Sequence, residues 1–299
     1  MSTDPVAPAH RGAIHDIGYR HYDGPRLGRR HAATSLYLES LRGAYGLGRS
    51  MKSKVAPLML LVATCIPALI IGLVVAITGG AVLPLRQTEY LNEVQVLISI
   101  FLAVIAPSIM SRDLRFRVVS LYFSRPLHKV DYVLAKYAAA ATALFIYMAA
   151  PLIVLFASAL LADISFESTY PDFLRAVAEA AVLALVLAGI GLLIAALTPR
   201  RGLGVAAIIT VLLLLAGAQL ILVEITRELG NAVAAVYVSL LSPYSLVEGI
   251  ATSVLGAAST GSATPDGVLQ VGVYVAAALA LIAGLFGLLL LRYRRVSVS

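Results

Sequence analysis

The sequence has no tryptophan, one cysteine and few charged residues. Of its 299 residues, 13% are Asp, Glu, Lys or Arg, about half the share of an average soluble protein. A single cysteine forms no intramolecular disulfide, so we expect Cys65 to be a small lipid-facing or core residue. By contrast, 60% of the residues are hydrophobic and the mean hydropathy is +0.91. A soluble domain of this length cannot bury so much apolar surface, so the composition indicates an integral membrane protein.

Motifs for catalysis and metal binding are missing as well. The sequence has no GxxxxGK[ST] phosphate loop, no HExxH, no CxxC and no Cys/His pair at metal-ligand spacing. The histidines lie outside the apolar runs, where we expect them to be solvated or at the membrane interface: His10, His15, His21, His31 and His128. We therefore predict no enzyme activity and no cofactor or metal site in this chain.

Six apolar runs are long enough to cross a bilayer, which takes about 20 residues of helix. We expect the spans at about 55–78, 91–110, 133–161, 173–197, 203–223 and 268–291. The fold class is then all-α, a polytopic membrane protein. Its parts are an N-terminal cytoplasmic segment (1–53), a six-helix transmembrane domain (54–291) and a cytoplasmic tail (292–299). The first 50 residues contain no apolar signal-peptide core, so we expect the first span to insert uncleaved.

The distribution of Lys and Arg predicts the orientation. With six spans and a cytoplasmic start, the inner segments carry 20 of the 23 Lys and Arg, and the outer ones carry Arg86, Arg175 and Arg227. This asymmetry is what the positive-inside rule requires. We predict a plasma-membrane location with both termini in the cytoplasm. The same topology explains the basic charge, so we predict no nucleic-acid binding.

A helix is expected from about His31 to Met51, just before the first span. Its apolar stripe contains Tyr37, Leu38, Leu41 and Tyr45 at helical spacing. A basic amphipathic helix next to a span usually lies in the membrane interface, in contact with lipid. A solvated helix with a weak stripe is the alternative.

The stretch between the fifth and sixth spans, 224–267, is apolar but interrupted. Two short helices are expected at 231–241 and 244–255, with a break at Ser242-Pro243. Each is too short to span. We interpret the stretch as a re-entrant or interfacial element broken at Pro243, with a seventh span as the alternative.

Three ionisable residues mark the outer start of the fourth span. Asp172, Arg175 and Glu179 are spaced i, i+3, i+7, and we expect them to neutralise one another at the interface. A coupling-ion role for Glu179 is the alternative. Apart from Gln219 and Glu179, the spans are expected to lack buried polar or charged groups, which argues against a proton- or sodium-driven transporter.

The most informative stretch is 111–136, between the second and third spans. It carries six of the Lys and Arg residues, and Asp113 to Ser124 has a helical pattern that ends before Pro126. Such a short cytoplasmic helix is joined directly to the spans on either side, so a force applied to it by another protein would move both spans. An ordinary positive-inside loop with an interfacial helix is the alternative.

This stretch resembles the coupling-helix region of type-2 ATP-binding-cassette (ABC) exporter permeases. The resemblance rests on Asp113, a helix at 119–124, Arg125-Pro126, Lys129 and Lys136 in that order. The opening IHDIGYRHYDGPRLGR is also similar to such permeases, and Leu241-Ser242-Pro243 is similar to their extracellular re-entrant helices. One departure is Arg117-Val118, where the family often has Gly-Thr.

The resemblance implies a permease subunit that pairs with a second permease copy or paralogue and with cytosolic ATPase subunits that bind ATP and Mg²⁺. It implies that these residues face the ATPase: Asp113, Arg115, Phe116, Arg117, Tyr122, Phe123, Arg125, Pro126 and Lys129. It also favours export, although the cargo is not specified by the sequence. A secondary transporter or channel, or a membrane enzyme or scaffold, are the alternatives.

Overall fold

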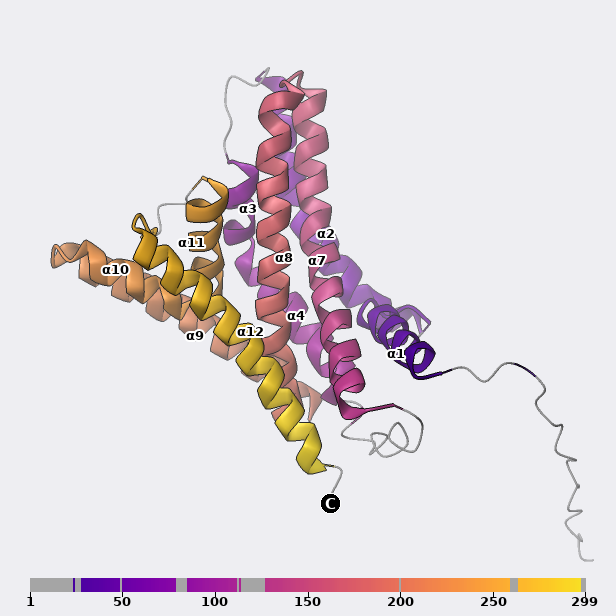
Figure 1. The fold of residues 1–299 in the computed structure, drawn as a ribbon. Helices are drawn as coiled ribbons and strands as arrows, with labels where there is room; N and C mark the ends of the chain where they lie inside the picture. The colour runs from indigo at the N-terminus through magenta and orange to yellow at the C-terminus, as the bar shows by residue number, and fades with distance from the viewer. Residues whose placement is uncertain are drawn as a thin grey trace, which may run out of the picture.

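The computed structural model describes residues 24, 28–48, 50–78, 85–111, 113, 127–198, 200–258 and 263–296 (Figure 1). Every regular element in these ranges is helical, which confirms the all-α prediction. The elements are α1 (Arg29–Ala44), α2 (Met51–Ile77), α3 (Gln87–Glu93), α4 (Gln95–Ile109), α7 (Lys129–Leu161), α8 (Phe166–Leu197), α9 (Arg201–Glu228), α10 (Ala232–Val238), η1 (Ser239–Leu241), α11 (Pro243–Leu255) and α12 (Val268–Val296).

Five of the described helices are long and apolar enough to cross a membrane: α2, α7, α8, α9 and α12. The number is six if α3 and α4 together form one span, and these two helices meet at an angle of 62°. The chain is thus a multi-pass membrane protein by the length and composition of its helices.

The second expected span, 91–110, is therefore not one straight helix. The bend lies at Val94, whereas Pro107 lies inside α4 without ending it. Next to the bend, the Tyr244 hydroxyl of α11 donates a hydrogen bond to the carbonyl of Gln95 at 3.0 Å. It also lies 2.7 Å from the hydroxyl of Ser99. A side chain from another element thus holds the first turn of α4 in place, which is a common accompaniment of a helix bend.

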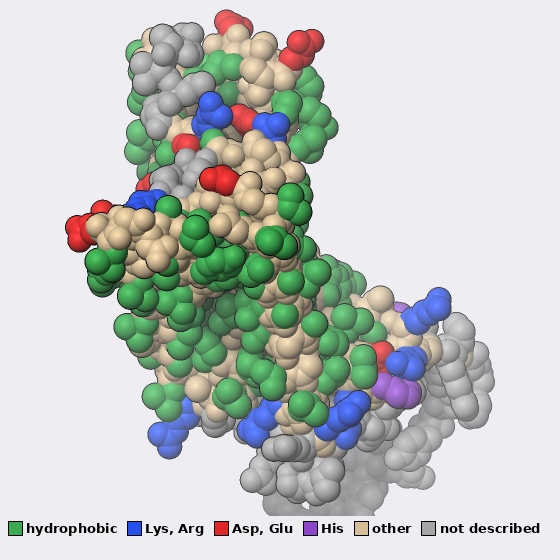
Figure 2. Space-filling view, turned by 60° about the vertical axis from the view of Figure 1, so that its left-hand side comes forward, with side chains coloured by type: hydrophobic (Ala, Val, Ile, Leu, Met, Phe, Trp, Pro, Cys, Tyr) green, Lys and Arg blue, Asp and Glu red, His purple; other side chains and the backbone are tan. Residues whose placement is uncertain are grey.

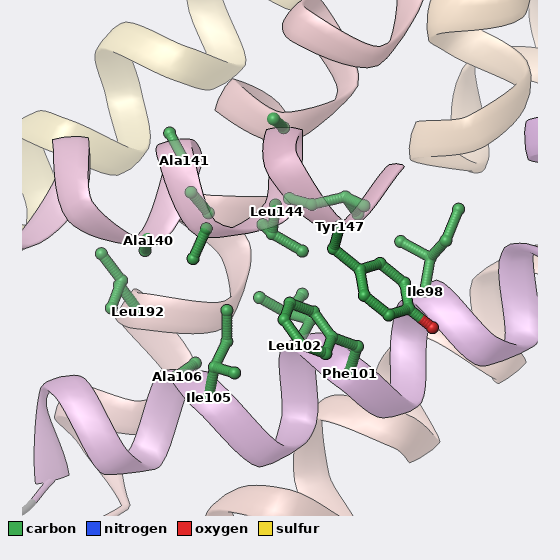
Figure 3. Packing of buried hydrophobic residues seen from close by; sticks show 14 of the residues in the cluster. Ile98, Phe101, Leu102, Ile105, Ala106, Ala140, Ala141, Leu144, Tyr147 and Leu192 are labelled. Atoms are coloured by element: carbon green, nitrogen blue, oxygen red, sulfur yellow. The ribbon is translucent and has the colours of Figure 1, made fainter. Parts of the chain in front are cut away.

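α7 and α8 form the centre of the bundle, and α4 packs against both. Figure 3 shows Ile98, Phe101, Leu102, Ile105 and Ala106 of α4 facing side chains of α7 and Leu192 of α8. Phe101 stacks on Tyr147 of α7, with ring centroids 3.9 Å apart. In a membrane, where lipid tails are as apolar as leucine, close packing of such side chains is what holds helices together.

The outer helices bury far less of their surface. Of the most apolar 18-residue stretch of each helix, only 17% is buried within the chain in α9 and in α12, against 61% in α8. Both helices diverge from the α7–α8 pair toward α10 (Figure 1). Their outward faces are available to lipid or to another membrane helix.

Small residues at four-residue spacing have two different environments. Ala184 and Ala188 of α8 are buried inside the chain, where they allow close helix packing. The corresponding stripe of α12, Ala276, Ala280 and Gly284, is exposed. The α12 stripe therefore packs on nothing within the described part of this chain.

Charges separate along the bundle. In Figure 2, most of the Lys and Arg side chains gather at the end where α4 ends and α7 begins, whereas most of the Asp and Glu side chains lie in the other half. This separation follows the alternation of basic and acidic links in the sequence.

Candidate functional site

A buried ion pair lies where α4 ends and α7 begins. The Nζ atom of Lys136 is 2.9 Å from Oδ2 of Asp113, and the two side chains are only 6% and 14% exposed. Lys136 also donates a hydrogen bond to the carbonyl of Ile109 at 3.0 Å. That carbonyl belongs to the last turn of α4, where helix carbonyls lack partners and favour a cation.

Aromatic rings enclose this ion pair. The Tyr132 hydroxyl donates a hydrogen bond to Oδ2 of Asp113 at 2.8 Å, so the carboxylate has two partners from α7. Nζ of Lys136 lies 5.6 Å from the centroid of the Tyr132 ring, within the range of a cation–π contact. The Tyr132 ring in turn packs against Tyr293 of α12, with centroids 5.2 Å apart.

A further contact links this cluster to α8. The Ser111 hydroxyl donates a hydrogen bond to the Ala195 carbonyl at 2.8 Å, near the end of α8. Residues from α4, α7, α8 and α12 therefore converge at one point. We call Asp113, Lys136, Tyr132 and Ser111 the anchor cluster. The anchor cluster holds the two ends of residues 111–136, the stretch that the sequence analysis found most informative.

The structure describes two of the residues predicted to face an ATPase. Asp113 points into the anchor cluster, and Lys129 is half-buried in the first turn of α7. The others lie outside the described residues: Arg115, Phe116, Arg117, Tyr122, Phe123, Arg125 and Pro126. The contact of this set with an ATPase stays a prediction, and the structure adds an internal role for Asp113.

The start of α7 is shaped by local sequence. His128 precedes the helix, and its backbone N–H donates to the Asp131 carboxylate at 3.2 Å. An acidic residue in the first turn accepts from the free backbone donors there and complements the helix dipole. The same carboxylate accepts two hydrogen bonds from the guanidinium of Arg29, at 2.5 and 2.8 Å.

α1 lies along α7 and completes the region. The Tyr37 hydroxyl donates to Oγ1 of Thr142 at 3.2 Å, and the Tyr45 hydroxyl donates to the carbonyl of Ala143 at 2.7 Å. Leu41 also packs against the core. Leu38 differs from the predicted stripe, because it is 46% exposed and lies outside the contact with α7.

Electrostatics in this region keep Arg29 charged and Tyr45 neutral. The hydrogen bond to Asp131 raises the pKa of the Arg29 guanidinium, so Arg29 stays charged. Burial raises the pKa of the Tyr45 phenol, and the neighbouring Tyr147 adds to this effect. Tyr45 therefore remains a hydrogen-bond donor to α7 at physiological pH.

The prediction that the spans lack buried charge apart from Glu179 is wrong, because Lys136 is only 5% exposed and lies inside α7. Glu179, which the prediction excepted, is 3% exposed. The predicted charge group at the start of α8 also divides: Arg175 pairs with Asp172 at 2.8 Å, whereas Glu179 faces Glu248 of α11. Glu179 was assigned to the interface because helical spacing shows only neighbours on its own helix, and α11 covers it from elsewhere in the chain.

The break predicted at Pro243 coincides with a helix start. Pro243 is the first residue of α11, where its missing N–H costs no hydrogen bond, and Ser242 precedes it. α11 ends at Leu255 and is capped by Gly256, whose φ of +66° is the left-handed conformation that glycine tolerates best.

Among the described residues, no group of three or more His, Cys, Asp or Glu side chains is arranged to hold a metal ion. Comparisons with protein-family models and with curated protein sequences found no match. The fold therefore defines the class as a polytopic helical membrane protein.

Proposed function

We propose that this chain is the transmembrane permease subunit of an ABC transporter, and that separate cytosolic ATPase subunits drive it as an exporter. The observation that carries this proposal is the buried Asp113–Lys136 ion pair at the base of the 114–126 segment. Because the pair joins the end of α4 to the first turns of α7, a force on the segment is passed to both helices together.

Two further features support a mechanical role for this end of the molecule. α1 is tied to α7 through Arg29, Tyr37 and Tyr45, so a partner that touches α1 also acts on α7. The basic side chains gather at the same end (Figure 2), and the positive-inside rule assigns such an end to the cytoplasm, where ATP is available.

The energy source is assigned to a partner because the sequence has no phosphate-binding loop. The partner would bind ATP and Mg²⁺ and contact the segment through Phe116, Tyr122, Phe123 and its arginines. The segment then has the role of a coupling helix. In the same proposal, the α10–α11 element is the extracellular re-entrant element.

A second permease copy is proposed on the outward face of α9 and α12. The exposed small-residue stripe of α12, Ala276, Ala280 and Gly284, supports this arrangement, since such stripes allow close approach of membrane helices. A test replaces Cys65 by Ala and Ala280 by Cys. Disulfide-linked dimers in membranes would support the interface, and a Cys at exposed Leu269, with the same background, is the matched control.

The test of the function is affinity purification of the full chain from gently solubilised membranes, followed by measurement of ATP hydrolysis. We expect a soluble ATPase to co-purify with the wild-type chain and to be lost from the variants Phe123→Asp and Arg125→Asp. Arg200→Asp is the matched control, because Arg200 is exposed at the start of α9 and outside the predicted contact. An ATPase that binds all of these variants equally would contradict the assignment.

A proton- or cation-driven secondary transporter is the second candidate. Glu179 and Glu248 favour it, because they are buried carboxylates close enough for their charges to interact. Proteoliposomes that contain this chain alone separate the two functions. Transport driven by an ion gradient without an ATPase would favour the second candidate.

A further inference from the structure

A polar cavity of about 550 Å³ lies between the α3–α4 bend, α9 and α11, and it opens on one side. It is separate from the anchor cluster, since none of its lining residues belongs to that cluster. A volume of this size suits a small organic molecule rather than a bare ion.

The α3–α4 bend contributes polar side chains to this cavity. Asn92, Glu93 and Gln95 flank the bend at Val94 and all three line the cavity wall. Interrupted helices in membrane proteins commonly expose polar groups in this way where they line a cavity, and such places are frequent binding sites.

Two buried side chains in the wall have no partner among the described residues. Gln219 of α9 and Ser245 of α11 are each only 9% exposed, and both line the cavity. Neither side chain makes a hydrogen bond or ion pair with any residue that the structure describes. Buried amides and hydroxyls almost always have a hydrogen-bond partner, so a molecule in the cavity is the expected partner for these two.

The charge of the wall indicates the kind of molecule. Three carboxylates line the cavity, Glu93, Glu224 and Glu248, against one guanidinium, that of Arg227. Arg227 lies 3.9 Å from Glu224, at the more exposed rim, whereas Glu248 is 2% exposed. A buried carboxylate wall favours a cation.

A metal ion does not suit this wall. No group of three or more His, Cys, Asp or Glu side chains in the described part of the chain is close enough to hold one. The remaining lining includes the apolar side chains of Val96, Leu220 and Val223. The ligand should therefore combine one positive charge with an apolar body.

We propose that this cavity binds an organic ammonium group with an apolar body. The carboxylate of Glu248 supplies the countercharge, and Gln219 and Ser245 accept hydrogen bonds from the ammonium N–H groups. The apolar side of the wall holds the body of the molecule. The same chemistry is present in a free amine and in the headgroup of phosphatidylethanolamine. The proposal concerns binding alone and does not depend on the ATPase partner.

The test uses the purified full chain in nanodiscs of phosphatidylglycerol, which has no ammonium group. Dansylcadaverine, a primary amine whose fluorescence rises in apolar surroundings, is the probe, and uncharged dansylamide is its matched control. We expect saturable binding of dansylcadaverine and at least tenfold weaker binding of dansylamide. Equal binding of the two probes would overturn the proposal.

Variants locate the site. Glu248→Gln should weaken dansylcadaverine binding at least tenfold and Gln219→Leu several-fold, whereas Glu228→Gln should leave it unchanged. Glu228 is exposed at the end of α9 and does not line the cavity. Because Glu248→Gln alters a buried site, the thermal unfolding midpoint of each variant is first compared with that of the wild type. If Glu248→Gln does not fold, the binding measurement on Gln219→Leu tests the proposal in its place. Wild-type affinity in a folded Glu248→Gln or Gln219→Leu variant would refute the assignment.

Lipid composition identifies the source of the ammonium group. If phosphatidylethanolamine in the nanodisc displaces dansylcadaverine, the ligand is a lipid headgroup. If saturable binding persists unchanged in its presence, the ligand is a free amine.

Discussion

Lys136 and Asp113, which lie on either side of residues 114–126 in the sequence, form an ion pair with Nζ 2.9 Å from Oδ2. The contact joins the residues that follow α4 to the second turn of α7. Its burial decides its importance, because a buried charge whose partner is removed is far more costly than an exposed one.

Lys136→Met should destabilise the protein by about 3–5 kcal/mol, because it leaves the Asp113 carboxylate buried with the Tyr132 hydroxyl as its described partner from α7. The measurement is denaturant unfolding of the full chain in detergent. The double variant Asp113→Leu/Lys136→Met should recover much of the loss, since no unpaired charge remains. A double variant as unstable as the sum of the single variants would show that the two residues do not act as a pair.

Arg29→Ala should leave the unfolding midpoint unchanged, because its ion pair with Asp131 is solvent-exposed on the arginine side. The expected effect is local: α1 is held less firmly on α7. Hydrogen exchange of the α1 amides should accelerate, while exchange in α8 stays as in the wild type. Accelerated exchange throughout the bundle would instead assign Arg29 a global structural role.

The positions of the long helices could be predicted from the sequence, but the bend at Val94 could not. Apolar runs of 20 or more residues leave few alternatives to a spanning helix, and α7, α8 and α12 lie over the predicted ranges. The region around Val94 has no proline or glycine to indicate a break. The contact that holds α4 there comes from Tyr244, about 150 residues away in the sequence.

Tyr244→Phe tests this contact. Its hydroxyl is buried between the Gln95 carbonyl and the Ser99 hydroxyl, so its loss should cost about 1–3 kcal/mol. Tyr237→Phe removes the same hydroxyl from a side chain that is 43% exposed and should be neutral. Both variants are compared by the denaturant midpoint. Equal midpoints would mean that Tyr244 does not hold the bend.

Gly249→Ala should destabilise the contact between α11 and α12 by about 1–3 kcal/mol. A Cβ at Gly249 would overlap Cε1 of Tyr274, whose ring is fully buried. Gly284→Ala on α12 is the matched control, because a Cβ there meets nothing within 4 Å. We expect Gly284→Ala to be neutral or slightly stabilising, since alanine favours helix. Thermal unfolding of both variants provides the comparison, and a stable Gly249→Ala variant would contradict the packing described here.

The anchor cluster could be predicted only in part because, like the bend, it depends on contacts between residues far apart in the sequence. The sequence placed Asp113 and Lys136 in one motif, but their direct contact depends on how α4 and α7 pack. Arg29 reaches Asp131 across about 100 residues of chain, and Glu179 meets Glu248 from another helix. Spacing within one helix predicts local neighbours, whereas these contacts are set by the packing of helices far apart in the sequence.

The most direct measurement of the central claim is ATP hydrolysis by the co-purified ATPase in proteoliposomes that contain the wild-type chain, Arg125→Asp or Lys136→Met. We predict that the wild-type chain binds the ATPase and stimulates hydrolysis. Arg125→Asp should release the ATPase, whereas Lys136→Met should retain it with most of the stimulation lost, because the motion no longer passes to α4 and α7 together. Full stimulation in both variants would contradict the claim that the segment closed by Asp113 and Lys136 transmits force to the bundle.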